Sequence, residues 1–218
     1  MRLVAANQAF SFNYTDPYQR SGIFVAFRVY DVTSGTAVFL SQVTGVYSAF
    51  GSYMASYTPA SGKSYLVVGL VYTDGSYATV DVSSPPTADV YSTLTTFLGV
   101  SYASYDQSAT LAVRGTVYDV SSGSPASPQT VSMSYVEHGV YFGSMTGVTG
   151  KTYDALGVVY TDGTFTTPDT TRAPSSDEFD CIILSSGGGS FLGPGKLTGQ
   201  LLTGSLYGSQ LSGILRET

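Results

Sequence analysis

The chain has 218 residues and a net charge of −6, and only 11% of its residues are charged, against about 25% in an ordinary globular domain. This balance, with nine scattered basic residues, excludes binding to a nucleic-acid backbone, and the single cysteine, Cys181, excludes an internal disulfide. No apolar run is long enough for a membrane span or a secretion signal, so we expect no membrane partner and a protein that is retained in the cytosol or released by lysis.

The first part of the chain is rich in Val, Thr and Tyr and shows no helical periodicity, which favours strands. The run SYLVVGLVYT is almost continuously apolar and is typical of a central strand. The sequence SYATVDV alternates and predicts a final strand before the turn residues SSPP. Strands are predicted over residues 10–14, 22–32, 37–43, 46–57, 64–73 and 76–82.

Asp74 and Gly75 separate the last two of these predicted strands. Asp-Gly between strand-like runs predicts a type I′ hairpin turn, because both residues tolerate a positive φ. The same turn is predicted at Asp162 and Gly163, and turn chemistry is favoured over a metal or catalytic role for both carboxylates.

The second part of the chain repeats the first at an offset of 88 residues without a gap. The motif VYDV at residues 29–32 recurs at 117–120, and VYTDG at 71–75 recurs at 159–163. A unit of this length is too long for a solenoid repeat and suits a small two-sheet domain. We therefore expect two tandem domains, over residues 1–86 and 87–174, and a third segment over residues 175–218.

Each copy resembles the immunoglobulin-like and fibronectin-III-like domains, with six or seven short strands and a tyrosine, Tyr65 or Tyr153, at the start of the penultimate strand. The resemblance implies two β-sandwiches and a corner-tyrosine hydroxyl that bonds back to the preceding loop. It departs from antibody domains, because the chain has no Trp and no cysteine two residues after either tyrosine.

The C-terminal segment begins with a predicted linker, RAPSSDEFD, and ends in repeated Leu-x-Gly units. Their spacing fits neither one helix face nor one strand face, which leaves a disordered tail or an extended segment stabilised by other chains. We expect docking or oligomerisation through this segment, with β-augmentation as one route. The residues expected to make the contacts are Leu197, Gly199, Leu202, Gly204, Leu206, Gly208, Leu211 and Gly213.

A search for catalytic or metal-binding residues predicts none. His138 is the only histidine, and neither a cysteine cluster nor a nucleophile motif accompanies it. Asp31 and Asp119 precede Ser-Gly turns and suit capping, and Glu137 and Glu178 are too few for a paired-carboxylate site. No cofactor is expected. Tyrosines offer a possible binding surface, although strand tyrosines are more often core residues: Tyr47, Tyr53, Tyr57, Tyr135, Tyr141 and Tyr207.

These features favour a non-enzymatic structural protein of a virus particle, assembled in the host cytoplasm. The chain is similar in composition and architecture to the immunoglobulin-like domains of tailed-bacteriophage virion proteins, such as decoration, head-fibre, collar, baseplate and tail proteins. That resemblance implies homo-oligomer or virion-protein partners. The alternatives are a module that binds host-surface glycan or protein, a bacterial surface protein, and an enzyme.

Overall fold

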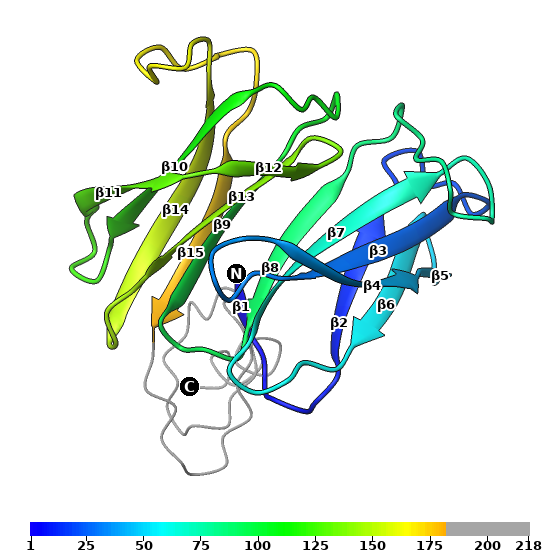
Figure 1. The fold of residues 1–218 in the computed structure, drawn as a ribbon, viewed down its shortest axis with the longest axis horizontal. Coiled ribbons are helices and arrows are strands. Elements are labelled where there is room, and N and C mark those ends of the chain that lie inside the picture. The colour runs from blue at the N-terminus through cyan, green and yellow to red at the C-terminus, as the bar shows by residue number, and fades with distance from the viewer. Residues whose placement is uncertain (182–218) are drawn as a thin grey trace, which may run out of the picture.

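The protein is all-β in the part of the chain that the structure, a computed structural model, describes, which is residues 1–181 (Figure 1). Fifteen strands and no helix are found there, and they fall into two units that follow one another along the chain. In Figure 1 the first unit occupies the right half of the picture and the second the left half, with β8 and β9 side by side between them.

The first unit has a large and a small sheet. The large sheet has the order β1-β8-β7-β3-β4, and the small sheet has the order β2-β6-β5. In the large sheet the bounds are β1 (Arg2–Leu3), β8 (Thr87–Ser92), β7 (Ser64–Tyr72), β3 (Phe24–Asp31) and β4 (Val38–Thr44); in the small sheet they are β2 (Phe10–Thr15), β6 (Ser52–Tyr57) and β5 (Val46–Tyr47).

The second unit repeats this arrangement. Its large sheet has the order β11-β10-β14-β15, and its small sheet has the order β12-β13-β9. In the large sheet the bounds are β11 (Ala126–Ser132), β10 (Ala112–Asp119), β14 (Lys151–Tyr160) and β15 (Ser175–Cys181); in the small sheet they are β12 (Ser134–Glu137), β13 (Val140–Thr146) and β9 (Phe97–Ala103). Strands β3 and β10 lie 88 residues apart, as do β4 and β11, so the sequence repeat is also a structural one.

Alternating side chains build the core between the two sheets of the first unit. Phe12 on β2 packs edge-on against Phe27 on β3, with ring centroids 4.8 Å apart, and Phe10 stacks on Tyr91 of β8 at 4.3 Å. All four side chains are nine-tenths or more buried. This core follows from period-2 patterning, because alternate residues of a strand point to the same face.

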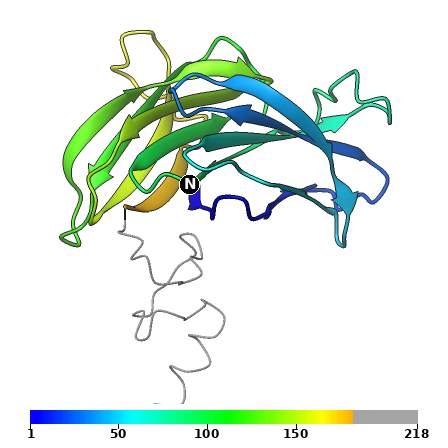
Figure 2. The same cartoon turned by 60° about the horizontal axis from the view of Figure 1, so that its bottom comes forward.

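A second core joins the two units. Leu66, Val68 and Leu70 of β7 point away from the first core and cluster with Leu98 and Phe142 of the second unit. For this reason every residue of β7 is buried, whereas β14, its counterpart, alternates between buried and half-buried positions. Figure 2 shows the strands of the two units running into one continuous body.

The predicted domain boundaries are wrong by one strand each. Residues 87–92 form β8, which pairs with β7 of the first unit, so that unit extends past residue 86. Residues 175–181 form β15 and pair with β14, although RAPSSDEFD, residues 172–180, was predicted to be a linker. The sequence misled here because Ser, Asp and Glu in this stretch look like linker residues, although Phe179 and Cys181 are buried.

The predicted strand over residues 76–82 is also wrong, since only Val80 forms a bridge, to Tyr72. Asp74 and Gly75 do not form the predicted type I′ turn, and neither do Asp162 and Gly163, because none of the four has a positive φ. The Asp74 carboxylate instead accepts hydrogen bonds from the amide and hydroxyl of Ser76, at 2.8 and 2.5 Å, and the positive φ falls on Tyr77. A side chain that bonds two residues ahead makes an alternative turn.

The predicted docking residues between Leu197 and Gly213 lie outside the described residues. Within residues 1–181, the structure contains no helix with the length and apolar character needed to cross a membrane.

Candidate functional site

The loops at one end of the two units are built in the same unusual way. Gln19 and Gln107 both have a positive φ, near 55°, and each backs onto a glycine, Gly51 or Gly139. A Cβ on either glycine would lie 2.5 Å from the Cα of the glutamine. Only glycine allows so close an approach, so both loops are held tightly against the hairpin of the small sheet.

In the first unit, an ion pair fixes this loop. Asp16 is fully buried, and its carboxylate accepts bonds from the backbone amide, Nε and Nη2 of Arg20, at 2.8, 3.0 and 2.8 Å. The Arg20 Nη2 also donates to Ser84 Oγ at 3.1 Å. Hydrogen bonds from Arg20 lower the pKa of Asp16, so its carboxylate is ionised although it is buried.

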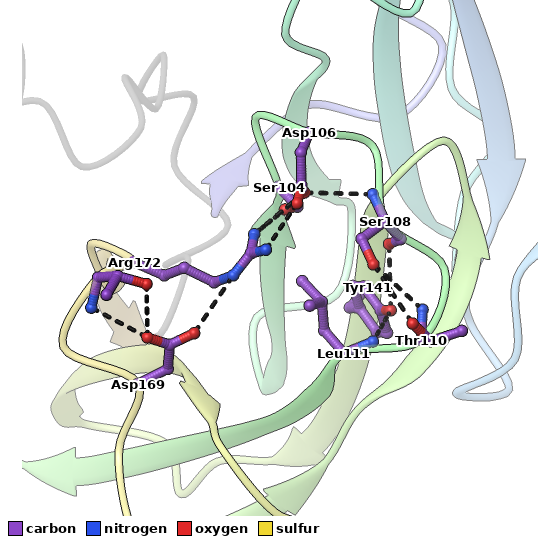
Figure 3. Close-up of polar contacts among 9 residues, drawn as sticks. Ser104, Asp106, Ser108, Thr110, Leu111, Tyr141, Asp169 and Arg172 are labelled. Carbon is purple, nitrogen blue, oxygen red and sulfur yellow. Dashed lines mark hydrogen bonds and ion pairs between the residues drawn. The ribbon is translucent and has the colours of Figure 1, made fainter.

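In the second unit, a related ion pair lies at the same place (Figure 3). Arg172 donates to both carboxylate oxygens of Asp106, at 3.0 and 2.6 Å, and to Ser104 Oγ at 2.8 Å. Its Nε lies 3.4 Å from Asp169 Oδ2. Hydrogen bonds from Arg172, and to a lesser extent from Ser104, hold the pKa of Asp106 well below its ordinary range.

The two ion pairs use different positions of the repeat. Arg20 corresponds to Ser108 in the second unit, and Arg172 corresponds to Ser84 in the first. The arginine therefore comes from opposite sides of the loop in the two units and finds a carboxylate in both. Both units have an arginine–aspartate ion pair here, although the arginine stands at different positions of the repeat. This indicates that the ion pair stabilises the loop end of each unit.

Two buried tyrosines anchor the same loops. The hydroxyl of Tyr53 accepts from the amide of Ile23 at 3.2 Å and donates to the carbonyl of Arg20 at 3.1 Å. The hydroxyl of Tyr141 makes the equivalent bonds to Leu111 and Ser108, at 2.8 and 3.2 Å. Tyr53 and Tyr141 were candidates for a contact surface, but both are 3% exposed and act within the fold.

Two adjoining hollows lie beside the ion pair of the second unit. One, of about 380 Å³, is lined by Asp89, Ser101 and Asp177 among others, and the other, of about 340 Å³, is lined by Tyr105, Asp106 and Arg172. Residues of both units line the first hollow. Burial raises the pKa of Asp89.

Exposed tyrosines from both units meet near these hollows. Tyr105 is 61% and Tyr18 64% exposed. A hydrogen bond with Tyr18 raises the pKa of Tyr105, and the Arg20 guanidinium lies 5.3 Å from the ring centre of Tyr18. The two rings and the neighbouring ion pairs offer stacking faces and hydroxyl groups, which suit a hydroxyl-rich ligand.

The predicted corner tyrosines, Tyr65 and Tyr153, are buried at the start of β7 and β14. The amide of Ala60 donates to the Tyr65 hydroxyl at 2.9 Å, and the amide of Val148 donates to the Tyr153 hydroxyl at the same distance. Both tyrosines therefore hold the loop five residues before them.

The aspartates singled out in the sequence all make turns. Asp162 accepts from the amide and hydroxyl of Thr164, at 2.8 and 2.5 Å, as Asp74 does from Ser76. Asp31 caps Thr33 and pairs with Lys63, and Asp119 caps Ser121 and pairs with Lys151. Gly75 and Gly163 follow Asp74 and Asp162 in these exposed loops.

The remaining candidates do not come together as a site. His138 lies in the turn between β12 and β13 with a φ of 39°. Glu137 is 8% exposed and pairs with Arg28 of the first unit, whereas Glu178 lies on β15. Residues 1–181 contain no group of three or more His, Cys, Asp or Glu placed to hold a metal ion. Tyr47 and Tyr135 are exposed, Tyr57 is half-buried, and Tyr207 lies outside the described residues.

The sequence analysis missed Asp16, Arg20, Asp106 and Arg172. The sequence does contain a signal for the two arginines. When the two copies are aligned at the 88-residue offset, Arg20 of the first copy aligns with a serine of the second, and Arg172 of the second aligns with a serine of the first. No comparable signal marks Tyr18 and Tyr105, which occupy different positions of the repeat and meet only in three dimensions.

No family model and no curated protein matches the chain. Among solved structures, it is similar to pullulanase type I from Bacillus subtilis complexed with maltose, at 14% identity over 82% of this chain and 24% of that chain, with a TM-score of 0.23. It is also similar to pullulanase from Anoxybacillus, alone and complexed with maltotriose, at 14% identity over 72% of this chain and 24% of that chain, with a TM-score of 0.22. The chain thus spans about a quarter of the length of these structures, and a likeness at such TM-scores carries no argument about fold or activity.

Proposed function

We propose that this chain is a non-catalytic structural component of a virus particle. Its two units are immunoglobulin-like β-sandwiches that together form one rigid arm, and residues 182–218 attach the arm to neighbouring copies or to other virion proteins. The proposal rests on the resemblance in composition and architecture to virion proteins, together with four features of the described residues.

The observation that carries the proposal is the core shared by the two units. Tandem domains on a flexible linker move independently unless a large apolar interface joins them. Here the outer face of the first large sheet is covered by the second unit, and Arg28 of β3 pairs with Glu137 of β12 across the junction. Such a body transmits position and force, as a structural arm must.

The carboxylates support a structural role as well. Hydrogen bonds within the turns and ion pairs lower the pKa of Asp16, Asp74, Asp106 and Asp162. A carboxylate with a lowered pKa is a poor general acid near neutral pH, because it is already ionised.

The sheet arrangement supports the immunoglobulin-like assignment. In each unit a small sheet faces a large one, and a buried tyrosine bonds back to the preceding loop, as corner tyrosines do in these domains.

The ends of the described chain support attachment at one side. The N-terminal amine of Met1 lies 3.2 Å from Oδ1 of Asp177 on β15, the last described strand, so both ends of the described chain lie at the same side of the body. A segment that follows Cys181 therefore anchors the arm at this side and leaves the outer ends of both units to project.

The test is particle incorporation. Virions purified on a density gradient are expected to contain the chain, and a chain that ends at Cys181 is expected to fold with unchanged circular dichroism but to be missing from the particles. Recovery of the full chain only in the soluble fraction, or incorporation of the shortened chain, would contradict the proposal.

A second candidate function is binding to a host-surface glycan, which the exposed Tyr18 and Tyr105 favour. Aromatic rings beside charged hydrogen-bonding groups bind sugar rings by stacking. Tyr105 lines one hollow, and the hollow that adjoins it lies at the junction of the two units. The measurement is a glycan array with the full chain.

In that experiment Tyr18→Ala and Tyr105→Ala are expected to abolish any binding, whereas Tyr135→Ala, a change at an exposed tyrosine on β12, is expected to leave it intact. Binding that survives both changes would move the site elsewhere, and the absence of any binding would leave the structural role alone.

A further inference from the structure

An unusually apolar rim borders the first unit. Of the thirteen large hydrophobic residues that are exposed in residues 1–181, seven lie between Val38 and Met54. The rim is formed by β4 and β5, the edge strands of the large and small sheets, which follow one another through Gly45. We define the β4–β5 rim by its exposed side chains: Val38, Phe39, Leu40, Val46 and Tyr47, with exposed fractions of 55, 48, 44, 69 and 42%.

The equivalent rim of the second unit is protected against pairing with another chain. Strand β11 occupies the place of β4, and it reads Ala-Ser-Pro-Gln-Thr where β4 reads Val-Phe-Leu-Ser-Gln. Pro128 stands at the position of Leu40, and Ser134 at that of Val46. Proline and polar residues on an edge strand are a known protection against pairing with another chain, because proline donates no hydrogen bond.

In the β4–β5 rim, the first three residues of β4 are apolar and proline is absent. No residue between Asp31 and Lys63 carries a charge, and β4 contains neither proline nor glycine. Leu40 lies at a β-bulge, since Val29 pairs with Ser41 and Tyr30 with Phe39, and β11 has a register shift at the equivalent place, so the bulge does not distinguish the two rims. An exposed, apolar and uncharged edge strand is a template for pairing with another strand.

The absence of charge indicates what covers the rim. The whole chain carries a net charge of −6, so two copies repel each other wherever their charged surfaces approach. The two strands of the β4–β5 rim bring no charged side chain to a two-fold interface, and the Arg28 guanidinium, which lies 5.1 Å from the ring centre of Phe39, is paired with Glu137. A symmetric interface needs a surface that is complementary to itself, and an uncharged apolar strand edge meets this condition in antiparallel pairing.

The area of the rim is sufficient for a dimer. The exposed fractions correspond to roughly 400–500 Å² of apolar side-chain surface per copy, so a symmetric pair buries about 1,000 Å², the lower limit for a specific interface. Antiparallel pairing of the two β4 strands adds backbone hydrogen bonds at the junction.

We propose that two copies of this chain associate through their β4–β5 rims, with β4 pairing antiparallel to β4 of the second copy. The two large sheets then continue into each other. This interface does not depend on residues 182–218 or on the virion proposal, because all its residues belong to the first unit.

The test compares a double substitution with its matched control. Sedimentation velocity of the full chain is expected to show association with a dissociation constant of about 10 µM or tighter. In Leu40→Lys/Val46→Lys, two pairs of lysines face each other across the axis, and the constant is expected to rise at least about 100-fold. The control, Pro128→Lys/Ser134→Lys, places the same residues on the equivalent rim of the second unit and is expected to change it less than about 3-fold.

Hydrogen exchange tests the same interface without any substitution. The amides of residues 38–44 are expected to exchange more slowly as the concentration of the full chain rises, whereas those of residues 126–132 stay unchanged. A full chain that is monomeric at about 100 µM would overturn the proposal. Equal weakening by the two double variants, or exchange on β4 that does not depend on concentration, would overturn it as well.

Discussion

The outer faces of β7 and β14 derive from the same repeat but have different neighbours. On β7, Leu66, Val68 and Leu70 are completely or almost completely buried, because the second unit covers them. On β14 the corresponding residues are Asp154, Leu156 and Val158, which are half-buried.

The neighbouring strands differ in the same way. Val90 of β8 corresponds to Glu178 of β15, and Ala26 of β3 corresponds to Arg114 of β10. Buried residues on the covered face are therefore replaced by charged ones on the open face. The residues on the inner face of each large sheet therefore form the core of its own unit, and the residues on the outer face determine whether another unit packs against the sheet.

The largest expected effect comes from giving the covered face a residue of the open face. Leu66→Asp puts an unpaired carboxylate into the shared core and is expected to lower the free energy of unfolding by about 3–5 kcal/mol. The reciprocal change, Asp154→Leu, is expected to alter it by less than about 1 kcal/mol, since that position is half-buried. Urea unfolding of both variants measures the difference, and equal effects would show that the two faces are equivalent.

The two loop ion pairs are expected to differ in strength. Asp16 has no exposed side-chain surface, whereas Asp106 is 48% exposed. Arg20→Ala leaves a buried carboxylate without its partner and is expected to cost about 2–4 kcal/mol, and Arg172→Ala about 1 kcal/mol, because water solvates Asp106. Urea unfolding of the two variants gives both values, and a larger loss for Arg172→Ala would contradict this ranking.

A close contact between the units gives a smaller effect. A Cβ on Gly99 of β9 would lie 2.7 Å from Cγ1 of Val90 on β8. Gly99→Ser, which introduces the residue found at the equivalent position 11, is expected to cost about 1–3 kcal/mol through this overlap. The reverse change, Ser11→Gly, is expected to cost about 0.5–1 kcal/mol, from backbone entropy alone. Thermal unfolding measures the loss of stability in each variant. A Gly99→Ser chain as stable as the parent would contradict the close contact between β8 and β9.

The smallest expected effect is a loss of stability at low pH. Hydrogen bonds from Lys151 and Ser121 lower the pKa of Asp119 in the folded chain to about 2, from an ordinary value of 3.8. A carboxylate with a lower pKa in the folded state contributes stability above its unfolded pKa, and this contribution is lost as the pH falls from about 4 towards 2. The melting temperature should therefore drop across this interval, and less steeply in Asp119→Asn. An identical pH profile for the variant would show that this pair contributes nothing.

Much of the fold follows from local patterning. The alternation of Phe10, Phe12 and Tyr14 and the apolar run of β7 predict strands, and the structure has strands there. The 88-residue repeat predicts two similar units, and the strands recur at that spacing. What patterning did not show is which strand ends each unit, because β15 is polar on one face and was mistaken for a linker.

The candidate site was harder to predict for a physical reason. Arg172 and Asp106 are 66 residues apart and meet only because two loops converge at one end of the unit. At the 88-residue offset Tyr105 corresponds to Pro17 and Tyr18 to Asp106, so the repeat does not pair the two tyrosines. The hairpin prediction at Asp74 was wrong because the carboxylate bonds to Ser76, which changes the type of turn.

Calorimetry of the unchanged full chain tests most directly whether the two units are one body. The shared core of Leu66, Val68, Leu98 and Phe142 predicts a single unfolding transition whose calorimetric and van't Hoff enthalpies agree. Two separate transitions, one for each unit, would contradict the account, because units that melt apart cannot depend on a common core.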